Sequence, residues 1–301
     1  MSRIEKALEE ALKHREEKQV DESPGNGGPK PDMPDVHKEK PQEDTGVKHI
    51  FTSSGIEIDP NVVSPYLVSI NNQNSSYVEN YRKIRTSIIS KTRGNAGTTI
   101  MLTSSLMGEG KTITAVNLAV VMARGVDHTV LLVDADLRRP AVHRYFGVDI
   151  NKGLSDYLDN ESADISDILI KTGIGKLVIL PAGSPKDNPS ELLTSMRMQN
   201  LVKELKSRYK DRYIIFDTGP LLLSAEASTL GSWMDGVVFV IQEGKVPQKT
   251  AMQGFELIKG CNILGVVMNN VNEFSLAGTR LGAYDYAYGY GAKEKGVKGK
   301  G

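Results

Sequence analysis

Four residues in one short stretch have the types and the spacing that bind phosphate. Gly108, Gly110, Lys111 and Thr112 lie in the sequence TTIMLTSSLMGEGKTIT at 98–114, which is typical of an apolar strand, a small-residue loop and the start of a helix. The backbone N–H groups of such a loop face an anion. Lys111 would reach the outer phosphates of a nucleotide, and the Thr112 hydroxyl would sit on Mg²⁺. A glycine-rich turn also occurs without a ligand, so the rest of the sequence has to decide.

Three aspartates follow two apolar runs further along the chain. Asp134 is the last residue of the apolar run 128–134, and Asp136 follows two positions later. Asp217 is the last residue of the apolar run 212–217. One aspartate in such a place is commonly a turn former or a helix cap. Three of them at strand ends beside a phosphate loop predict a Mg²⁺–nucleotide site, because a hard cation takes oxygen ligands. A carboxylate that the metal does not use could accept a proton from an attacking hydroxyl group.

Apolar runs alternate with helical patterns through the middle of the chain. The runs are almost continuously apolar, which is the pattern of parallel strands buried on both faces. We predict strands at 98–104, 128–134, 176–182, 212–217, 236–242 and 263–269, and helices at 75–91, 111–124, 191–208 and 247–259. The expected fold class is therefore α/β, a doubly wound, mainly parallel sheet of the P-loop NTPase type. Ligands of such folds bind outside the carboxyl ends of the strands.

Composition divides the chain into four regions. Residues 1–17 have the periodicity of an amphipathic helix, and 18–62 hold many prolines, glycines and charges, which predicts a disordered linker. Residues 63–280 form the expected P-loop domain. The stretch 281–301 is rich in glycine and lysine, so we expect a flexible tail that carries a tyrosine cluster, Tyr284, Tyr286, Tyr288 and Tyr290. Such a cluster is a candidate phosphate acceptor, or simply a low-complexity tail.

The overall charge and cysteine content exclude some classes of protein. Lysine plus arginine and aspartate plus glutamate both number 37, so no global basic excess indicates a nucleic-acid partner. The single cysteine, Cys261, cannot form an intramolecular disulfide, which fits a reducing compartment. No apolar run approaches the ~20 residues that a membrane span needs. We expect a cytoplasmic protein that a partner would have to bring to a membrane.

A charged ridge is predicted on the helix at 75–91. Glu79, Arg82 and Arg85 follow one another at intervals of three and so lie along one side of that helix. The ridge is either a solvated charged face or a surface for self-association, in which an acid of one subunit meets arginines of the next.

Taken together, these motifs resemble the bacterial tyrosine kinases of polysaccharide synthesis and export, the BY-kinases. The resemblance covers about residues 63–290. It rests on the Walker A motif at 104–112, the Walker A′ sequence LLVDADLRRP at 131–140, the Walker B sequence IIFD at 214–217, the E-x-x-R-x-x-R oligomerisation motif of Glu79, Arg82 and Arg85, the segment NPSELL at 188–193, and the tyrosine cluster. The start MSRIEKALEEA is similar to that of cytosolic members tied to exopolysaccharide and exosortase gene clusters.

The resemblance implies autophosphorylation on tyrosine with ATP and Mg²⁺. The implied catalytic residues are Lys111, Asp134, Asp136 and Asp217, with Asp134 as the candidate base for an incoming tyrosine. Thr112, Asp136 and Asp217 would serve the metal. The residues implied for nucleotide binding are Gly108, Glu109, Gly110, Lys111, Thr112, Ile113 and Asn269, the last on the adenine side. The implied phosphate acceptors are Tyr284, Tyr286, Tyr288 and Tyr290.

The resemblance also implies partners and a place of action. Glu79, Arg82 and Arg85 would build a homo-oligomeric ring in which the tail of one subunit enters the site of its neighbour. A separate membrane protein, a chain-length determinant, would activate the kinase and recruit it to the inner face of the plasma membrane. A tyrosine phosphatase would remove the phosphate, and the implied role is regulation of exopolysaccharide or capsule synthesis and export.

The sequence departs from the family pattern at several positions. Ser105 replaces the first glycine of the phosphate loop, and Met107 stands where proline is usual. Gly219, Glu226 and Gln242 replace a proline, an aspartate and an arginine that are frequent in the family. The first two departures are tolerable, and the last three affect the fine placement of a nucleotide or an activator but not the fold.

Two other functions fit the same fold. A positioning ATPase of the Min/Par type carries a second lysine early in the phosphate loop, where this chain has Leu106. A nucleotide-binding regulatory subunit without turnover would not need the full set of Lys111, Asp134, Asp136 and Asp217. These residues argue against both, which we keep as alternatives to the kinase.

Overall fold

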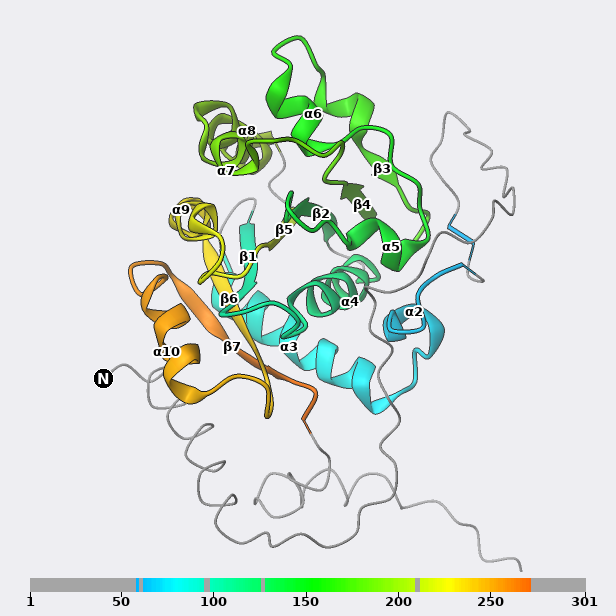
Figure 1. Ribbon diagram of the computed structural model, residues 1–301. Helices are drawn as coiled ribbons and strands as arrows, with labels where there is room; N and C mark the ends of the chain where they lie inside the picture. Colours follow the sequence, from blue (N-terminus) through cyan, green and yellow to red (C-terminus); the bar gives the residue numbers. More distant parts are fainter. Residues whose placement is uncertain (1–57, 60–61, 95–97, 126–127, 209–211, 272–301) are drawn as a thin grey trace, which may run out of the picture.

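A seven-stranded sheet lies at the centre of the computed structural model (Figure 1). The structure describes residues 58–59, 62–94, 98–125, 128–208 and 212–271. The predictions for the N-terminal helix, for most of the linker and for the tyrosine tail fall outside these residues, so they remain predictions.

The strand order is β3-β4-β2-β5-β1-β6-β7. All neighbouring strands are parallel except β3, which pairs antiparallel with β4. This arrangement confirms the predicted doubly wound, mainly parallel α/β fold. The strands are β1 Thr98–Ser104, β2 Thr129–Ala135, β3 Ile170–Lys171, β4 Leu177–Leu180, β5 Arg212–Thr218, β6 Gly236–Gln242 and β7 Ile263–Asn269. The sequence did not indicate β3, because two residues are too short to show a pattern.

The helices are α2 Val68–Asn71, α3 Ser76–Thr92, α4 Lys111–Ala123, α5 Val142–Phe146, α6 Leu154–Asp159, the 3₁₀ turn η1 Ile165–Ile168, α7 Pro189–Thr194, α8 Met196–Arg208, α9 Ala225–Trp233 and α10 Gln248–Glu256. The helix predicted at 191–208 is in fact two helices. Ser195 is extended between them, and its hydroxyl accepts a hydrogen bond from the Met198 N–H at 3.1 Å, as an N-cap does.

Each face of the sheet packs against its own hydrophobic core. Side chains of α2, α3, α4 and α5 cover one face, and those of α6, α7, α8, α9 and α10 cover the other. Successive residues of β1 alternate between the two cores: Ile100 and Leu102 face α4, and Met101 faces the opposite core. This double burial explains why the strands read as continuous apolar runs.

Helix α4 connects the core to the phosphate loop. Ten consecutive residues, 114–123, are buried, so the helix is held on all sides by β1, β2, β5, α2 and α3. Its first residue is Lys111, directly after the loop. The loop therefore starts from a central strand and ends on a buried helix, and both ends are rigid.

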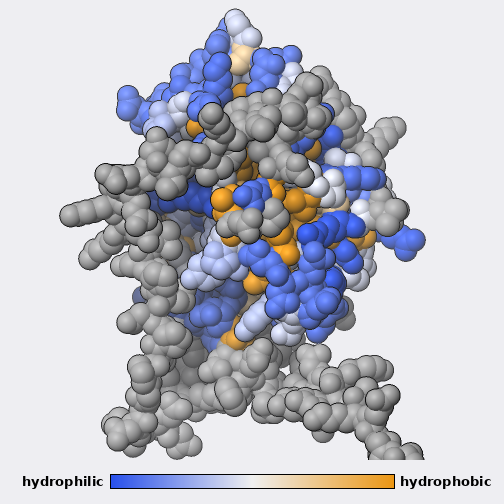
Figure 2. All heavy atoms as spheres, turned by 90° about the vertical axis from the view of Figure 1, so that its right-hand side faces the viewer, coloured by the Kyte–Doolittle hydropathy of each residue, from blue (hydrophilic) through white to orange (hydrophobic). Residues whose placement is uncertain are grey.

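The surface turned toward the viewer in Figure 2 is mostly hydrophilic, with a central hydrophobic patch. Among the residues that the structure describes, no helix is long and apolar enough to cross a membrane.

Candidate active site

The phosphate loop leads from β1 to α4 and is shaped by two glycines. Gly108 and Gly110 have φ angles of 78° and 90°, in the left-handed region that favours glycine. Gly110 is the N-cap of α4, and a Cβ there would collide with the side-chain amide of Asn269. That amide donates to the Glu109 carbonyl oxygen at 3.1 Å. The end of β7 thus braces the loop where the helix begins.

Ser105 replaces the first glycine of the phosphate-loop motif, and the space for its side chain is provided by Gly254 in α10. Its hydroxyl donates to the Ala251 carbonyl oxygen at 3.3 Å. A Cβ on Gly254 in α10 would lie 2.9 Å from the Ser105 Cα, closer than real side chains pack. The close approach that a loop glycine usually permits is therefore provided here by a glycine on the neighbouring helix.

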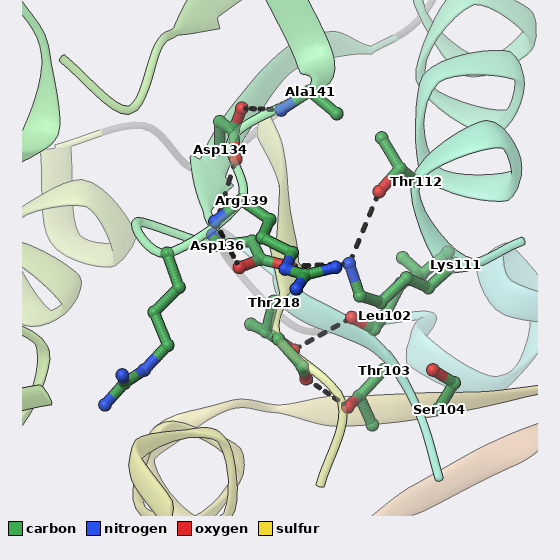
Figure 3. A network of polar contacts seen from close by, with 12 residues as sticks. Leu102, Thr103, Ser104, Lys111, Thr112, Asp134, Asp136, Arg139, Ala141 and Thr218 are labelled. Carbon is green, nitrogen blue, oxygen red and sulfur yellow. Dashed lines mark hydrogen bonds and ion pairs between the residues drawn. The ribbon is translucent and has the colours of Figure 1, made fainter. Parts of the chain in front are cut away.

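Lys111 is buried and points at a carboxylate (Figure 3). Its Nζ lies 2.8 Å from Asp136 Oδ2 and 3.5 Å from the Thr112 hydroxyl. Burial lowers the pKa of Lys111, but the charges of Asp217, Asp136 and Asp134 outweigh it and raise the pKa overall. Lys111 therefore stays charged, and it would exchange Asp136 for phosphate when a nucleotide binds.

Asp134 is fully buried and is held by backbone N–H groups. Its Oδ2 accepts from Ala141 and Val142 at 3.0 Å each, and its Oδ1 accepts from the Asp136 N–H at 3.3 Å (Figure 3). Burial raises the pKa of Asp134, and Asp217 and Asp136 add to this rise. The carboxylate fixes the loop that carries Asp136 between β2 and α5.

Asp217 has no hydrogen-bond partner on either carboxylate oxygen within the described chain, although it is fully buried. Burial raises the pKa of Asp217. The charge of Lys111 and the nearby Thr112 hydroxyl partly oppose this rise in the pKa. The Thr112 hydroxyl does not form a hydrogen bond with Asp217. An orphaned buried carboxylate is costly unless it has a ligand to bind.

These residues fit Mg²⁺ held jointly with phosphates. No group of three or more histidine, cysteine, aspartate or glutamate side chains in the described ranges is arranged to hold a metal alone. Mg²⁺ usually takes only one or two carboxylates and completes its shell with waters and substrate phosphates. Thr112, Asp136 and Asp217 are the residues that would hold it.

Comparisons with known proteins agree with this geometry. Residues 97–273 match a family described as an AAA domain. The chain is 37% identical over 219 residues to tyrosine-protein kinase YwqD of Bacillus subtilis, covering 72% of this chain and 87% of YwqD. The chain belongs to the family of bacterial tyrosine-protein kinases. It is 33% identical over 198 residues to tyrosine-protein kinase CpsD of Streptococcus agalactiae, covering 65% of this chain and 84% of CpsD. The kinase domain of the Escherichia coli tyrosine kinase ETK superposes with a TM-score of 0.63 at 29% identity, covering 70% of this chain and 83% of that domain.

The fold brings most of the tyrosine-kinase residues predicted from sequence to one place. Polar or backbone contacts join the loop, Lys111, Asp136 and Asn269, while Asp134 and Asp217 lie opposite each other on β2 and β5. Ile113 occupies the first turn of α4 behind Gly110. The four tail tyrosines lie outside the described residues.

The predicted oligomerisation motif lies on α3, apart from this cluster. Arg82 pairs with Glu79 of the same helix at 3.0 Å and donates to the Gln73 carbonyl oxygen at 3.1 Å. Arg85 donates to the Val121 carbonyl oxygen near the end of α4 at 3.2 Å. Within one subunit these groups therefore already have partners, which a ring contact would have to replace.

Sequence reasoning missed a three-residue network beside the Walker A′ loop. Arg138 Nε lies 3.1 Å from Glu226 Oε1, and its guanidinium donates to the Ser190 hydroxyl at 2.7 Å. Ser190 in turn donates to Glu226 Oε2 at 2.8 Å. Glu226 is almost fully buried. The network ties the Walker A′ loop to α7 and α9.

Proposed function

We propose that this chain is an ATP-dependent protein-tyrosine autokinase that phosphorylates its own tail on Tyr284, Tyr286, Tyr288 and Tyr290. The observation that carries the proposal is the convergence of Lys111, Asp136 and the unpartnered Asp217 at the mouth of the phosphate loop. The family assignment gives the reaction class, because the relatives are named tyrosine-protein kinases.

In this reaction the phenolic oxygen of a tyrosine attacks the γ-phosphorus of ATP. The bond from that phosphorus to the bridging oxygen breaks, ADP leaves, and the phenol gives up its proton. Lys111 would hold the phosphates, and bound Mg²⁺ would neutralise their charge. Asp134 is our candidate proton acceptor, because it lies opposite Asp217 at the carboxyl ends of β2 and β5 and close enough for its charge to act on Lys111.

We further propose that phosphorylation occurs between subunits. The ridge of Glu79, Arg82 and Arg85 would join subunits in a ring, and a membrane activator of the chain-length-determinant class would bring the kinase to the plasma membrane. A tyrosine phosphatase would reverse the modification. Regulation of exopolysaccharide or capsule export rests on the resemblance alone.

A mixing experiment tests both the chemistry and the direction of transfer. A K111M chain with an intact tail is incubated with Mg-ATP, the cytosolic segment of the membrane partner, and a chain whose four tail tyrosines are changed to phenylalanine. We expect phosphotyrosine on the tail of the K111M chain, mapped by mass spectrometry, because only the other chain retains a working site. A further chain carrying both changes is the control that should stay unlabelled when it replaces the K111M chain.

The positioning ATPase is the alternative that this experiment separates. Leu106 packs partly buried against the core and cannot supply the second loop lysine of that class. Steady ATP hydrolysis by the wild-type chain without label on any tail tyrosine would reject the autokinase and favour the ATPase.

A further inference from the structure

A second lysine touches the phosphate loop from outside. Lys245 lies in the turn between β6 and α10, and its Nζ donates to the Gly108 carbonyl oxygen at 3.0 Å. The exposed side chain crosses the loop so closely that a Cβ on Gly108 would collide with its ammonium group. An ammonium has three donors, and Gly108 takes one of them. The loop therefore meets cations from two directions, Lys111 from its own helix and Lys245 from the neighbouring turn.

This contact acts on a peptide group that belongs to the anion cradle. The Gly108 carbonyl and the Glu109 N–H are the two ends of one planar peptide unit. In a phosphate loop the N–H groups are the donors to phosphate. A cation at the carbonyl end polarises the unit and strengthens the N–H as a donor, as happens in chains of hydrogen bonds.

A buried carboxyl group in the loop lies within the electrostatic reach of this lysine. Glu109 is fully buried, and its Oε1 accepts from the Leu106 N–H at 2.7 Å, while Oε2 has no partner within the described chain. Burial raises the pKa of Glu109, and backbone hydrogen bonds and the charge of Lys245 oppose the rise. The charge of Lys245 favours the ionised form of Glu109 and offsets the repulsion that this form would exert on a bound phosphate.

We propose that Lys245 is a positioning residue of the nucleotide site, which strengthens the binding of nucleoside di- and triphosphates through the Gly108–Glu109 peptide group. This inference rests on the proposed function, because it takes the ligand of the loop to be a nucleotide. It adds a residue that lies outside the Walker sequences and that sequence reasoning did not single out.

Equilibrium binding to the full chain tests this role without any turnover. The probe is ADP carrying a fluorescent methylanthraniloyl group, and unlabelled adenosine is measured by competition. The K245M variant should bind the ADP probe about tenfold more weakly, the scale of one charge-assisted hydrogen bond, with unchanged adenosine affinity. K245R should keep most of the affinity. K249M, which removes an equally exposed lysine from the first turn of α10, is the matched control and should bind like wild type.

Two results would overturn the inference alone. One is an ADP affinity of K245M equal to that of K249M. The other is a parallel loss of ADP and adenosine affinity with a lower unfolding temperature, which would mean that Lys245 only supports the loop. A wild-type chain that binds adenosine but gains nothing from the phosphates of ADP or ATP would instead overturn the proposed function, and this inference with it.

Discussion

Asp134 and Asp217 are directly opposite each other in the register of β2 and β5, and both are fully buried. Asp134 accepts three backbone hydrogen bonds, whereas Asp217 accepts none within the described chain. Two neighbouring carboxylates thus have different tasks. One shapes the Walker A′ loop, and the other stays unpartnered and suited to a ligand.

This difference predicts opposite effects of two similar substitutions. D217N should raise the free energy of unfolding of the nucleotide-free protein at pH 7 by about 2 kcal/mol, because it removes a buried charge that accepts no hydrogen bond in the described chain and that Lys111 offsets only in part. It should also abolish tail labelling. D134N places an amide donor against backbone N–H groups and should cost about 1–3 kcal/mol. Urea unfolding of both variants checks the pair, and stabilities that change in the same direction would contradict it.

The same carboxylate predicts a dependence of stability on pH. In the folded chain the pKa of Asp217 is about 6, against about 4 for an unfolded aspartate. Between these values the folded state binds more protons than the unfolded state, so stability should fall as pH rises from about 4 to about 6. The D217N variant should show a smaller fall over that range. An equal slope for both proteins in thermal unfolding would refute the assignment.

The contact between Ser105 and Gly254 predicts a compensating pair. G254A should destabilise the protein by about 1–3 kcal/mol, because the new methyl group would overlap Ser105 in a packed core. The S105G/G254A double variant should recover part of this loss, since it removes the contacts with the Ser105 Cβ and Oγ but leaves the contact with the Cα. Gly260 has no atom near its missing Cβ, so G260A is the control and should change stability by less than about 0.5 kcal/mol. Failure of S105G to rescue G254A would argue against the compensation.

The ion pair between Glu79 and Arg82 predicts separate effects on folding and assembly. Both side chains are largely exposed, so R82E should cost under about 1 kcal/mol of stability. If α3 forms the ring, R82E should reduce the oligomer to a monomer, and the E79R/R82E exchange should restore it. Light scattering measures the size, with K152E as a control for the same change of charge. An oligomer unaffected by R82E would place the interface elsewhere.

In the network of Arg138, Ser190 and Glu226, we expect the interaction energy between Arg138 and Glu226 to decrease at acid pH. Burial raises the pKa of Glu226, but hydrogen bonds from the backbone, Ser190, Ser224 and Arg138 lower it overall. The stability that this pair adds should therefore be present at neutral pH and be lost as pH falls into the acid range. R138M should cost about 1–3 kcal/mol at pH 7. A double-mutant cycle with E226Q should give a smaller coupling at pH 4 than at pH 7, and equal couplings would contradict the prediction.

The sequence by itself determined the fold class and pointed to residues that the fold gathers around the phosphate loop. Strands buried on both faces leave continuous apolar runs, and a phosphate loop needs glycine, lysine and threonine at fixed spacing, so both features can be read locally. The aspartates at the ends of β2 and β5 follow from the rule that parallel strands end at one edge. The sequence did not predict short helices such as α5 and α9 or the two-residue strand β3, because so few residues do not show a clear hydrophobic periodicity.

Only the tertiary structure decided how the loop is supported. Gly254 makes room for Ser105, and Arg138 joins Glu226 across 88 positions. Asn269 at the end of β7 and Lys245 in the turn after β6 hold the loop. The sequence also could not show that Asp134 is engaged by backbone N–H groups while Asp217 is not. These relationships join residues that are distant along the chain and come together only when the sheet forms, so no local pattern records them.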